Sequence, residues 1–463
     1  MTKTTERSAA ATVERLPLSA MLGAAGLAIP LICGRWGSYI GISPLFLADA
    51  LVISGASLTL MRPSSYPAMA RFPRVYWLCW TATALFIVAS MLQGYGDLVT
   101  RIRDLIPWFY LLLLPAVAQW AMVAGSRRIL DYLTITLLAH AAWAIPAMLG
   151  VLPSIELPAN VFGEALFGVR ADVDVPLLAA SVVLVFYRWG MRPATVLFLA
   201  LAAGAATAQT SRAALVASVL AVVVFAFLRG HLRGAQGVVR VLAIVPMLAL
   251  IVVVLLPRLS SSSDQFDSGA LARAGVYGSA EASASGEGTA NARFESWKIL
   301  VDHYAEEGYP ALGLGAGAEI VLETGAVRYL SGATDVRAPH NWWVHALVRT
   351  GYIGLLLWIA LLVTGVRLRS GRWKGRDAGF DRAMGALLMI SMCLTSTLGV
   401  VVEAPFGSHV LLVGAALFGL SAQYQRIPGK SSAMVDSPGR GGGEPHEPRR
   451  SAAEVSTWRA KRP

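Results

Sequence analysis

The sequence predicts an all-α protein that crosses a membrane many times. Of the 463 residues, 56% are hydrophobic and only 14% are charged, whereas about a quarter of the residues in a soluble domain are charged. The mean hydropathy is +0.58. Apolar runs of roughly 17 to 25 residues recur along the chain, and a helix of that length spans the hydrocarbon core of a bilayer.

About twelve apolar runs are candidates for transmembrane helices. They begin near Leu18, Leu45, Val75, Leu105, Leu130, Val173, Ala194, Ala213, Val238, Trp342, Ala383 and Phe406. Pro44 and Asp49 interrupt the second run, and Arg349 interrupts the tenth. The first run follows basic residues and has no convincing cleavage site, so we expect a retained signal anchor.

The distribution of basic residues predicts the orientation of these helices. With a cytoplasmic N-terminus, the N-terminal segment, the cytoplasmic loops and the C-terminal tail together contain 27 of the 39 Lys and Arg residues. Membrane proteins keep this excess on the cytoplasmic side. The net charge of +11 therefore indicates membrane topology rather than nucleic-acid binding.

The chain divides into five segments on this basis. Residues 1–17 form a cytoplasmic N-terminus, 18–256 the first nine helices, 257–338 a long outer loop, and 339–424 the last three helices. Residues 425–463 contain mainly Gly, Pro, Ser and charged residues. Such a composition buries too little apolar surface to fold, so we expect a disordered cytoplasmic tail.

The outer loop changes character along its length. Residues 260–290 are rich in Ser, Gly and Ala and predict a flexible linker. Residues 291–307 predict an amphipathic surface helix. The apolar residues that recur there at helical spacing are Phe294, Trp297, Leu300 and Val301. The following Gly313-Leu-Gly315-Ala-Gly317 lacks the strand-turn-helix context of a dinucleotide site, so it predicts a turn with close backbone packing.

His340 is the first candidate for chemistry, because it lies where the polar loop meets the tenth apolar run. An imidazole at a membrane boundary can be partly desolvated and still exchange protons near neutral pH. Trp342 and Trp343 follow it and fit an aromatic belt at the membrane interface. The three cysteines lie inside apolar runs and the outer acids are dispersed, so the sequence predicts neither disulfides nor a metal site.

Several motifs occur in an order that resembles the O-antigen ligase and polymerase superfamily. In chain order they are Thr210-Ser211-Arg212, Arg293-Phe-Glu-Ser-Trp297, Gly313-Leu-Gly315, His340-Asn341 and Gly351-Tyr-Ile-Gly354. The resemblance covers residues 196–362 at the level of motifs. It implies a metal-independent inverting glycosyltransferase in the bacterial inner membrane, which takes a glycan from undecaprenyl diphosphate on the periplasmic face and needs no cofactor.

The resemblance also implies roles for individual residues. Arg212 and Arg293 correspond to arginines that hold the diphosphate, and His340 to the histidine that engages the acceptor hydroxyl. These roles suit the chemistry, because guanidinium groups stabilise the charge of a leaving diphosphate and an imidazole can accept the hydroxyl proton. At Arg170 the sequence departs from the family pattern, since Ala171-Asp-Val-Asp-Val-Pro176 follows it.

Three residues are possible supporting residues of the site: Arg170, Asn341 and His345. His345 lies five residues after His340, which is about 140° around a helix. The two histidines would therefore not share one face.

Two acceptors are compatible with this resemblance. Transfer to the lipid A core would make the protein an O-antigen ligase of lipopolysaccharide biosynthesis, and transfer to a second lipid-linked glycan would make it an O-antigen or exopolysaccharide polymerase. One dominant outer loop, beside a short loop at 151–172, slightly favours the ligase. A polysaccharide transporter or flippase is a more distant alternative, because the chain lacks the two repeated halves common in transporters.

Overall fold

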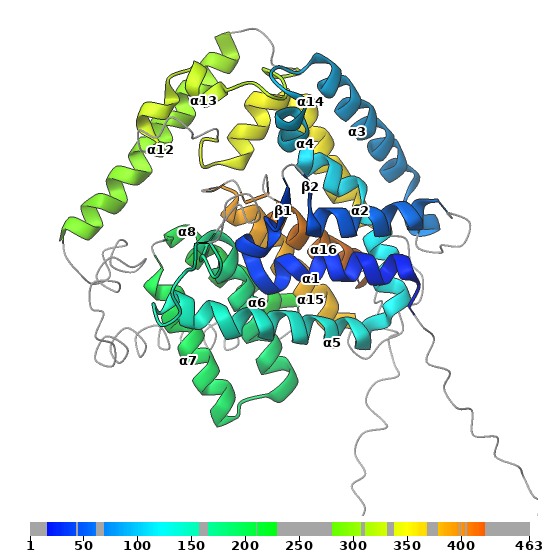
Figure 1. The fold of residues 1–463 in the computed structure, drawn as a ribbon, viewed down its shortest axis with the longest axis vertical. Helices are drawn as coiled ribbons and strands as arrows, with labels where there is room; N and C mark the ends of the chain where they lie inside the picture. Colours follow the sequence, from blue (N-terminus) through cyan, green and yellow to red (C-terminus); the bar gives the residue numbers. More distant parts are fainter. Residues whose placement is uncertain are drawn as a thin grey trace, which may run out of the picture. The chain divides into compact units, whose positions relative to one another are not determined.

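The computed structural model is that of an all-α membrane protein with one short hairpin, β1 (Gly41–Ile42) and β2 (Leu45–Phe46). It describes residues 16–42, 45–61, 69–156, 165–209, 211–228, 280–306, 311–330, 338–367, 378–397, 399, 401–402 and 405–421. The helices (Figure 1) are α1 (Leu18–Ser38), α2 (Leu47–Leu60), η2 (Met69–Arg71), α3 (Arg74–Gln93), α4 (Leu98–Leu112), α5 (Leu114–Met148), α6 (Ala171–Trp189), α7 (Pro193–Ala208), α8 (Arg212–Leu228), α12 (Ala280–Glu306), α13 (Ile320–Glu323), η3 (Ala326–Tyr329), α14 (Trp342–Gly365), α15 (Ala378–Thr395) and α16 (Pro405–Ser421).

Most of the helices coincide with apolar runs of the sequence. Within the described ranges, α1, α3, α5 and α14 are long and apolar enough to cross a membrane, and α2 and α7 are shorter apolar helices. The run predicted from Val238 and the tail at 425–463 lie outside the described residues. The prediction of a helical, multi-pass membrane protein is confirmed.

The fourth and fifth runs are divided differently from the prediction. We expected breaks before Leu105 and Leu130, but α4 ends at Leu112 and α5 begins at Leu114. Pro115 lies in the first turn of α5, where its missing N–H costs nothing. The long helix α5 then kinks at Gly125, which has a φ of 76°.

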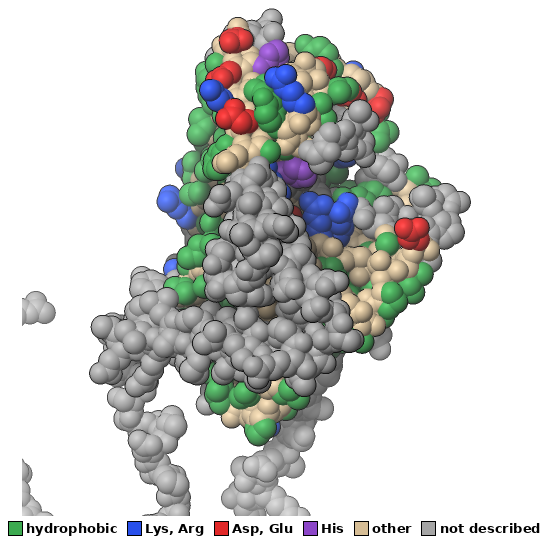
Figure 2. Space-filling model, turned by 90° about the vertical axis from the view of Figure 1, so that its left-hand side faces the viewer, with side chains coloured by type: hydrophobic (Ala, Val, Ile, Leu, Met, Phe, Trp, Pro, Cys, Tyr) green, Lys and Arg blue, Asp and Glu red, His purple; other side chains and the backbone are tan. Residues whose placement is uncertain are grey.

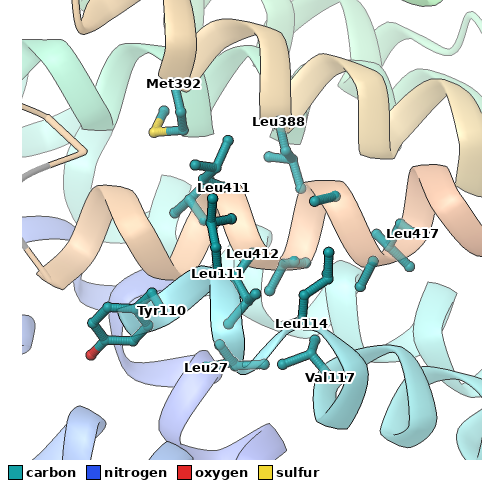
Figure 3. Close-up of a cluster of buried hydrophobic side chains, with 14 of the residues drawn as sticks. Leu27, Tyr110, Leu111, Leu114, Val117, Leu388, Met392, Leu411, Leu412 and Leu417 are labelled. Atoms are coloured by element: carbon teal, nitrogen blue, oxygen red, sulfur yellow. The ribbon is translucent and has the colours of Figure 1, made fainter. Parts of the chain in front are cut away.

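The core lies where α1, α4, α5, α15 and α16 meet. Its side chains (Figure 3) include Leu27, Leu111, Leu114, Leu388 and Leu411. Two glycines allow α15 and α16 to pack closely: a Cβ on Gly385 would lie 2.7 Å from the carbonyl oxygen of Gly414. Small residues at such crossings are typical of membrane helices, because they let backbones approach one another.

Trp342, the first residue of α14, does not lie in the expected aromatic belt, whereas Trp343 is only half-buried. Trp342 is fully buried, with its ring centroid 4.5 Å from that of Trp358 and 5.9 Å from that of Trp108. The indole of Trp108 donates a hydrogen bond of 2.7 Å to the carbonyl of Gly354. The aromatic side chains thus bind α14 to α4 inside the protein.

The predicted amphipathic helix is longer than its apolar pattern indicated. Helix α12 begins at Ala280, so residues 280–290 are helical and not a flexible linker. Alanine and glutamate are strong helix formers and outweigh the serines and glycines there. The rest of the predicted linker, 260–279, lies outside the described residues.

Candidate active site at the start of helix α14

Asn341 determines where α14 begins. Its side-chain oxygen accepts hydrogen bonds from the backbone N–H groups of Trp343 (2.9 Å) and Val344 (3.2 Å), which is the usual role of asparagine at a helix N-cap. The N–H of Trp342 donates to the carbonyls of Ser396 (2.9 Å) and Gly399 (3.1 Å). These hydrogen bonds fix the backbone directly after His340, which is the residue before the N-cap.

His340 is also fixed from its other side. The indole N–H of Trp297 in α12 donates a hydrogen bond of 2.6 Å to the carbonyl of Pro339. Between these two anchors, the backbone of His340 has a φ of 52°, in the left-handed region that non-glycine residues seldom adopt. Its imidazole is half-buried.

Arg293 lies on the face of α12 that packs against the protein. Leu300 is 0% and Tyr304 is 7% exposed, and both pack against α13, η3 and α14. Counting back from these residues by helical turns reaches Arg293, which is half-buried. Phe294 is 60% exposed, so the predicted apolar face was partly wrong.

Arg170 lies directly before helix α6. Its Nε is 3.6 Å from Oδ2 of Asp172, and its backbone N–H donates a hydrogen bond of 2.6 Å to Oδ2 of Asp174. Carboxylates in the first turn of a helix are stabilised by its dipole. Two acids that follow Arg170 thus fix both its backbone and its side chain.

Helix α8 begins at Arg212, and the residue before it contacts the carboxylate of Asp172. The hydroxyl of Ser211 donates to Oδ1 of Asp172 (3.1 Å) and accepts from the N–H of Ala214 (3.3 Å), so Ser211 caps α8. The backbone of Arg212 follows immediately. Its side chain lies outside the described part of the structure, so its role in the site is still a prediction.

His340 lies within electrostatic range of two arginines, Arg293 and Arg170, that are far from it in the sequence. Burial lowers the pKa of His340, the Arg293 and Arg170 guanidiniums lower it further, and the Asp172 carboxylate opposes them. Charges act on a pKa in this way only at short range. These effects favour the neutral imidazole, which is the form that can accept a proton. Figure 2 shows histidine and basic side chains beside one another on the face drawn.

His345 belongs to a separate buried cluster. Its Nε2 accepts a hydrogen bond of 3.0 Å from Nε of Arg349, and Nη1 of Arg349 donates to Oδ2 of Asp104. The same carboxylate oxygen accepts from the N–H of Gly317 at 2.8 Å. This network joins α4, α14 and the glycine-rich segment and includes His345, whose supporting role in the site is still a prediction.

The glycine-rich segment forms the closely packed turn that its sequence predicted. Gly351 interrupts the helical dihedrals of α14 with a φ of 63°. The carbonyls of Val348 and Arg349 then accept hydrogen bonds of 2.9 Å from the N–H groups of Leu314 and Gly315. Only glycine allows this approach, because a Cβ on Gly351 would lie 2.3 Å from the carbonyl oxygen of Ala311.

Two further observations concern a pocket and metal ligands. An apolar pocket is lined mainly by side chains of α1, α5 and α16, including Leu27, Trp120 and Leu417, and by none of the candidate site residues. Within the described ranges, no group of three or more His, Cys, Asp or Glu side chains is placed to hold a metal ion.

These features define a multi-pass helical membrane protein with a basic, histidine-containing site at a helix start. Residues 195–359 match the family model described as O-antigen ligase. This match places the segment in the O-antigen ligase and polymerase superfamily and confirms the resemblance seen in the motifs. It includes Arg212, Arg293 and His340, whereas Arg170 and Asp172 precede it. A search of curated proteins found no match to the chain.

Sequence reasoning did not single out Asp172, Ser211 or Asp104. A signal was present, because charged residues within or beside membrane helices are costly and are usually paired. The partners could not be identified from spacing, since Asp104 and Arg349 are 245 positions apart.

Proposed function

We propose that this protein is a metal-independent glycosyltransferase that moves a glycan from undecaprenyl diphosphate to an acceptor hydroxyl. One observation carries the proposal: the half-buried His340 lies within electrostatic range of Arg293 and Arg170. The match to the O-antigen ligase family supports the same class of reaction.

The arginines would bind the diphosphate of the donor. As the bond between the anomeric carbon and the diphosphate oxygen breaks, the electron pair leaves with the diphosphate. Guanidinium groups stabilise that charge with fixed donors that stay protonated. Arg293 and Arg170 supply two such groups, and Arg212 would add a third from the start of α8.

His340 would act as the general base. The acceptor hydroxyl oxygen forms the new bond to the anomeric carbon while its proton passes to the imidazole. The lowered pKa of His340 favours the neutral imidazole, which is the form that accepts a proton. A single displacement of this kind inverts the configuration at the anomeric carbon.

The proposed location is the bacterial inner membrane, with both termini in the cytoplasm and the site facing the periplasm. The excess of basic residues in the predicted cytoplasmic segments supports this orientation. The donor's polyprenyl chain would then lie in the bilayer, and its glycan would lie outside it.

Between the two acceptors we favour the lipid A core, which makes the protein an O-antigen ligase. The dominant loop at 257–338 and the short loop at 151–172 support this choice. A polymerase acting on a second lipid-linked glycan is the alternative.

Analysis of surface glycans in a deletion strain distinguishes the two. Loss of a ligase leaves full-length chains on the lipid carrier, whereas loss of a polymerase leaves single repeat units on lipid A. Complementation with wild type should restore the glycan and His340→Ala should not. His303→Ala, which changes another histidine of the outer segment, is the matched control and should complement.

The same strains test the enzyme against a transporter. In the His340→Ala strain, lipid-linked precursor should accumulate on the periplasmic face. Precursor that stays on the cytoplasmic face would contradict the proposal and favour transport.

A further inference from the structure

Asp172 makes two polar contacts that join separate parts of the site. Oδ2 lies 3.6 Å from Nε of Arg170, and Oδ1 accepts a hydrogen bond of 3.1 Å from the hydroxyl of Ser211. Its side chain is only 19% exposed. One carboxylate thus connects the residue before α6 with the cap of α8.

The same carboxylate packs against the segment that holds α14. A Cβ added to Gly399 would lie 2.9 Å from Oδ2 of Asp172, so the carboxylate lies close to the backbone there. The carbonyl of Gly399 accepts the N–H of Trp342, two residues after His340. Asp172 therefore lies where three segments of the site converge.

We propose that Asp172 is a positioning residue that holds Arg170 and the start of α8 in place around His340. This inference rests on the proposed glycosyl transfer. Neither the resemblance nor the family match assigns Asp172 a role, since it precedes the matched segment.

The charges around His340 support this role. Two cations, Arg293 from α12 and Arg170 from the start of α6, disfavour the imidazolium, and Asp172 is the anion that opposes them. The segment between α15 and α16 contacts α14 through the backbone carbonyls of Ser396 and Gly399. These described contacts add no charged group near His340. Asp172 thus limits how far the arginines weaken the base.

Asp172→Asn separates the two functions of the carboxylate. The amide keeps an acceptor for Ser211 but removes the negative charge. In a pH profile of kcat/KM for glycan transfer by the full-length protein in nanodiscs, the acid limb should move down by about half a pH unit, as expected for one charge several ångströms away in a partly solvated site. The plateau should fall about tenfold, because Arg170 loses its partner.

Three further variants serve as controls. Asp172→Glu keeps the charge and should recover most of the activity. Ser211→Ala removes the hydrogen bond but leaves the acid limb in place. Asp131→Asn removes the carboxylate of the Arg188 pair (2.8 Å) near the other end of α6 and should behave as wild type.

Histidine titration by NMR makes the test independent of transfer. The 13C-histidine-labelled protein, with the His340 signal assigned from His340→Ala, should show a lower imidazole pKa in Asp172→Asn than in wild type. An unchanged titration, or an Asp172→Glu protein no better than Asp172→Asn, would overturn the inference. A shifted titration in a protein that transfers no glycan would instead overturn the proposed function alone.

Discussion

The close contact between α14 and the glycine-rich segment predicts a large effect of Gly351→Ala. Gly351 has a φ of 63° and a ψ of −177°. Gly190, after helix α6, has nearly the same backbone conformation, with a φ of 67° and a ψ of −162°. A Cβ on Gly190 would meet nothing within 4 Å, whereas one on Gly351 would lie 2.3 Å from the carbonyl oxygen of Ala311.

The two substitutions therefore share one cost and differ in another. Alanine in this region of backbone space costs about 1–3 kcal/mol at either position. At Gly351 the segment must also move away, which breaks the two hydrogen bonds that the carbonyls of Val348 and Arg349 accept. Each is worth about 1 kcal/mol. We expect Gly351→Ala to destabilise the protein by about 2 kcal/mol more than Gly190→Ala, the sum of these two hydrogen bonds.

Thermal unfolding of both variants in nanodiscs measures this difference. Membrane proteins of this size commonly unfold irreversibly, so midpoints are compared at one scan rate. Equal losses at Gly351 and Gly190 would refute the reasoning, because they would show that backbone conformation alone determines the cost.

Three further predictions concern the site and its scaffold. Arg293→Gln removes a positive charge and should raise the pKa of His340, which moves the acid limb of the transfer profile to higher pH. Arg293→Lys keeps the charge and should lower kcat without moving the acid limb. Equal shifts of the acid limb in both variants would contradict this prediction. Trp297→Phe removes the hydrogen bond to the carbonyl of Pro339, worth about 1 kcal/mol. It should reduce kcat with little loss of thermal stability. An unchanged kcat would show that this hydrogen bond is not needed to hold His340. Arg349→Met should cost about 3–5 kcal/mol by leaving Asp104 buried without this cation. Adding Asp104→Asn should restore part of that in a thermal melt, and strictly additive losses would argue against the ion pair.

The sequence was sufficient to predict most of the membrane helices, because a helix satisfies its own backbone hydrogen bonds and needs no distant partner. The motif resemblance assigned Arg293 and His340 to one site, which is still a prediction that their electrostatic proximity supports. The sequence could not predict the break at Leu113, where two helices abut within one apolar stretch. Hydropathy does not distinguish a continuous helix from two helices in series.

The orientation of α12 shows the same limit. Phe294 and Leu300 are both apolar, yet Phe294 is 60% exposed and Leu300 is 0% exposed. The buried face is decided by where η3 and α14 lie, which is a property of the fold and not of the helix. Asp172 escaped notice because its partner Ser211 is supplied by another helix.

Because His340 has a left-handed backbone conformation, the residue that would make the protein most stable at this position differs from the residue that activity requires. Glycine or asparagine would adopt a φ of 52° at less cost than histidine. His340→Gly should therefore melt at a higher temperature than wild type while transferring no glycan. Such a pair of results is typical of residues retained for chemistry at the expense of the folded state.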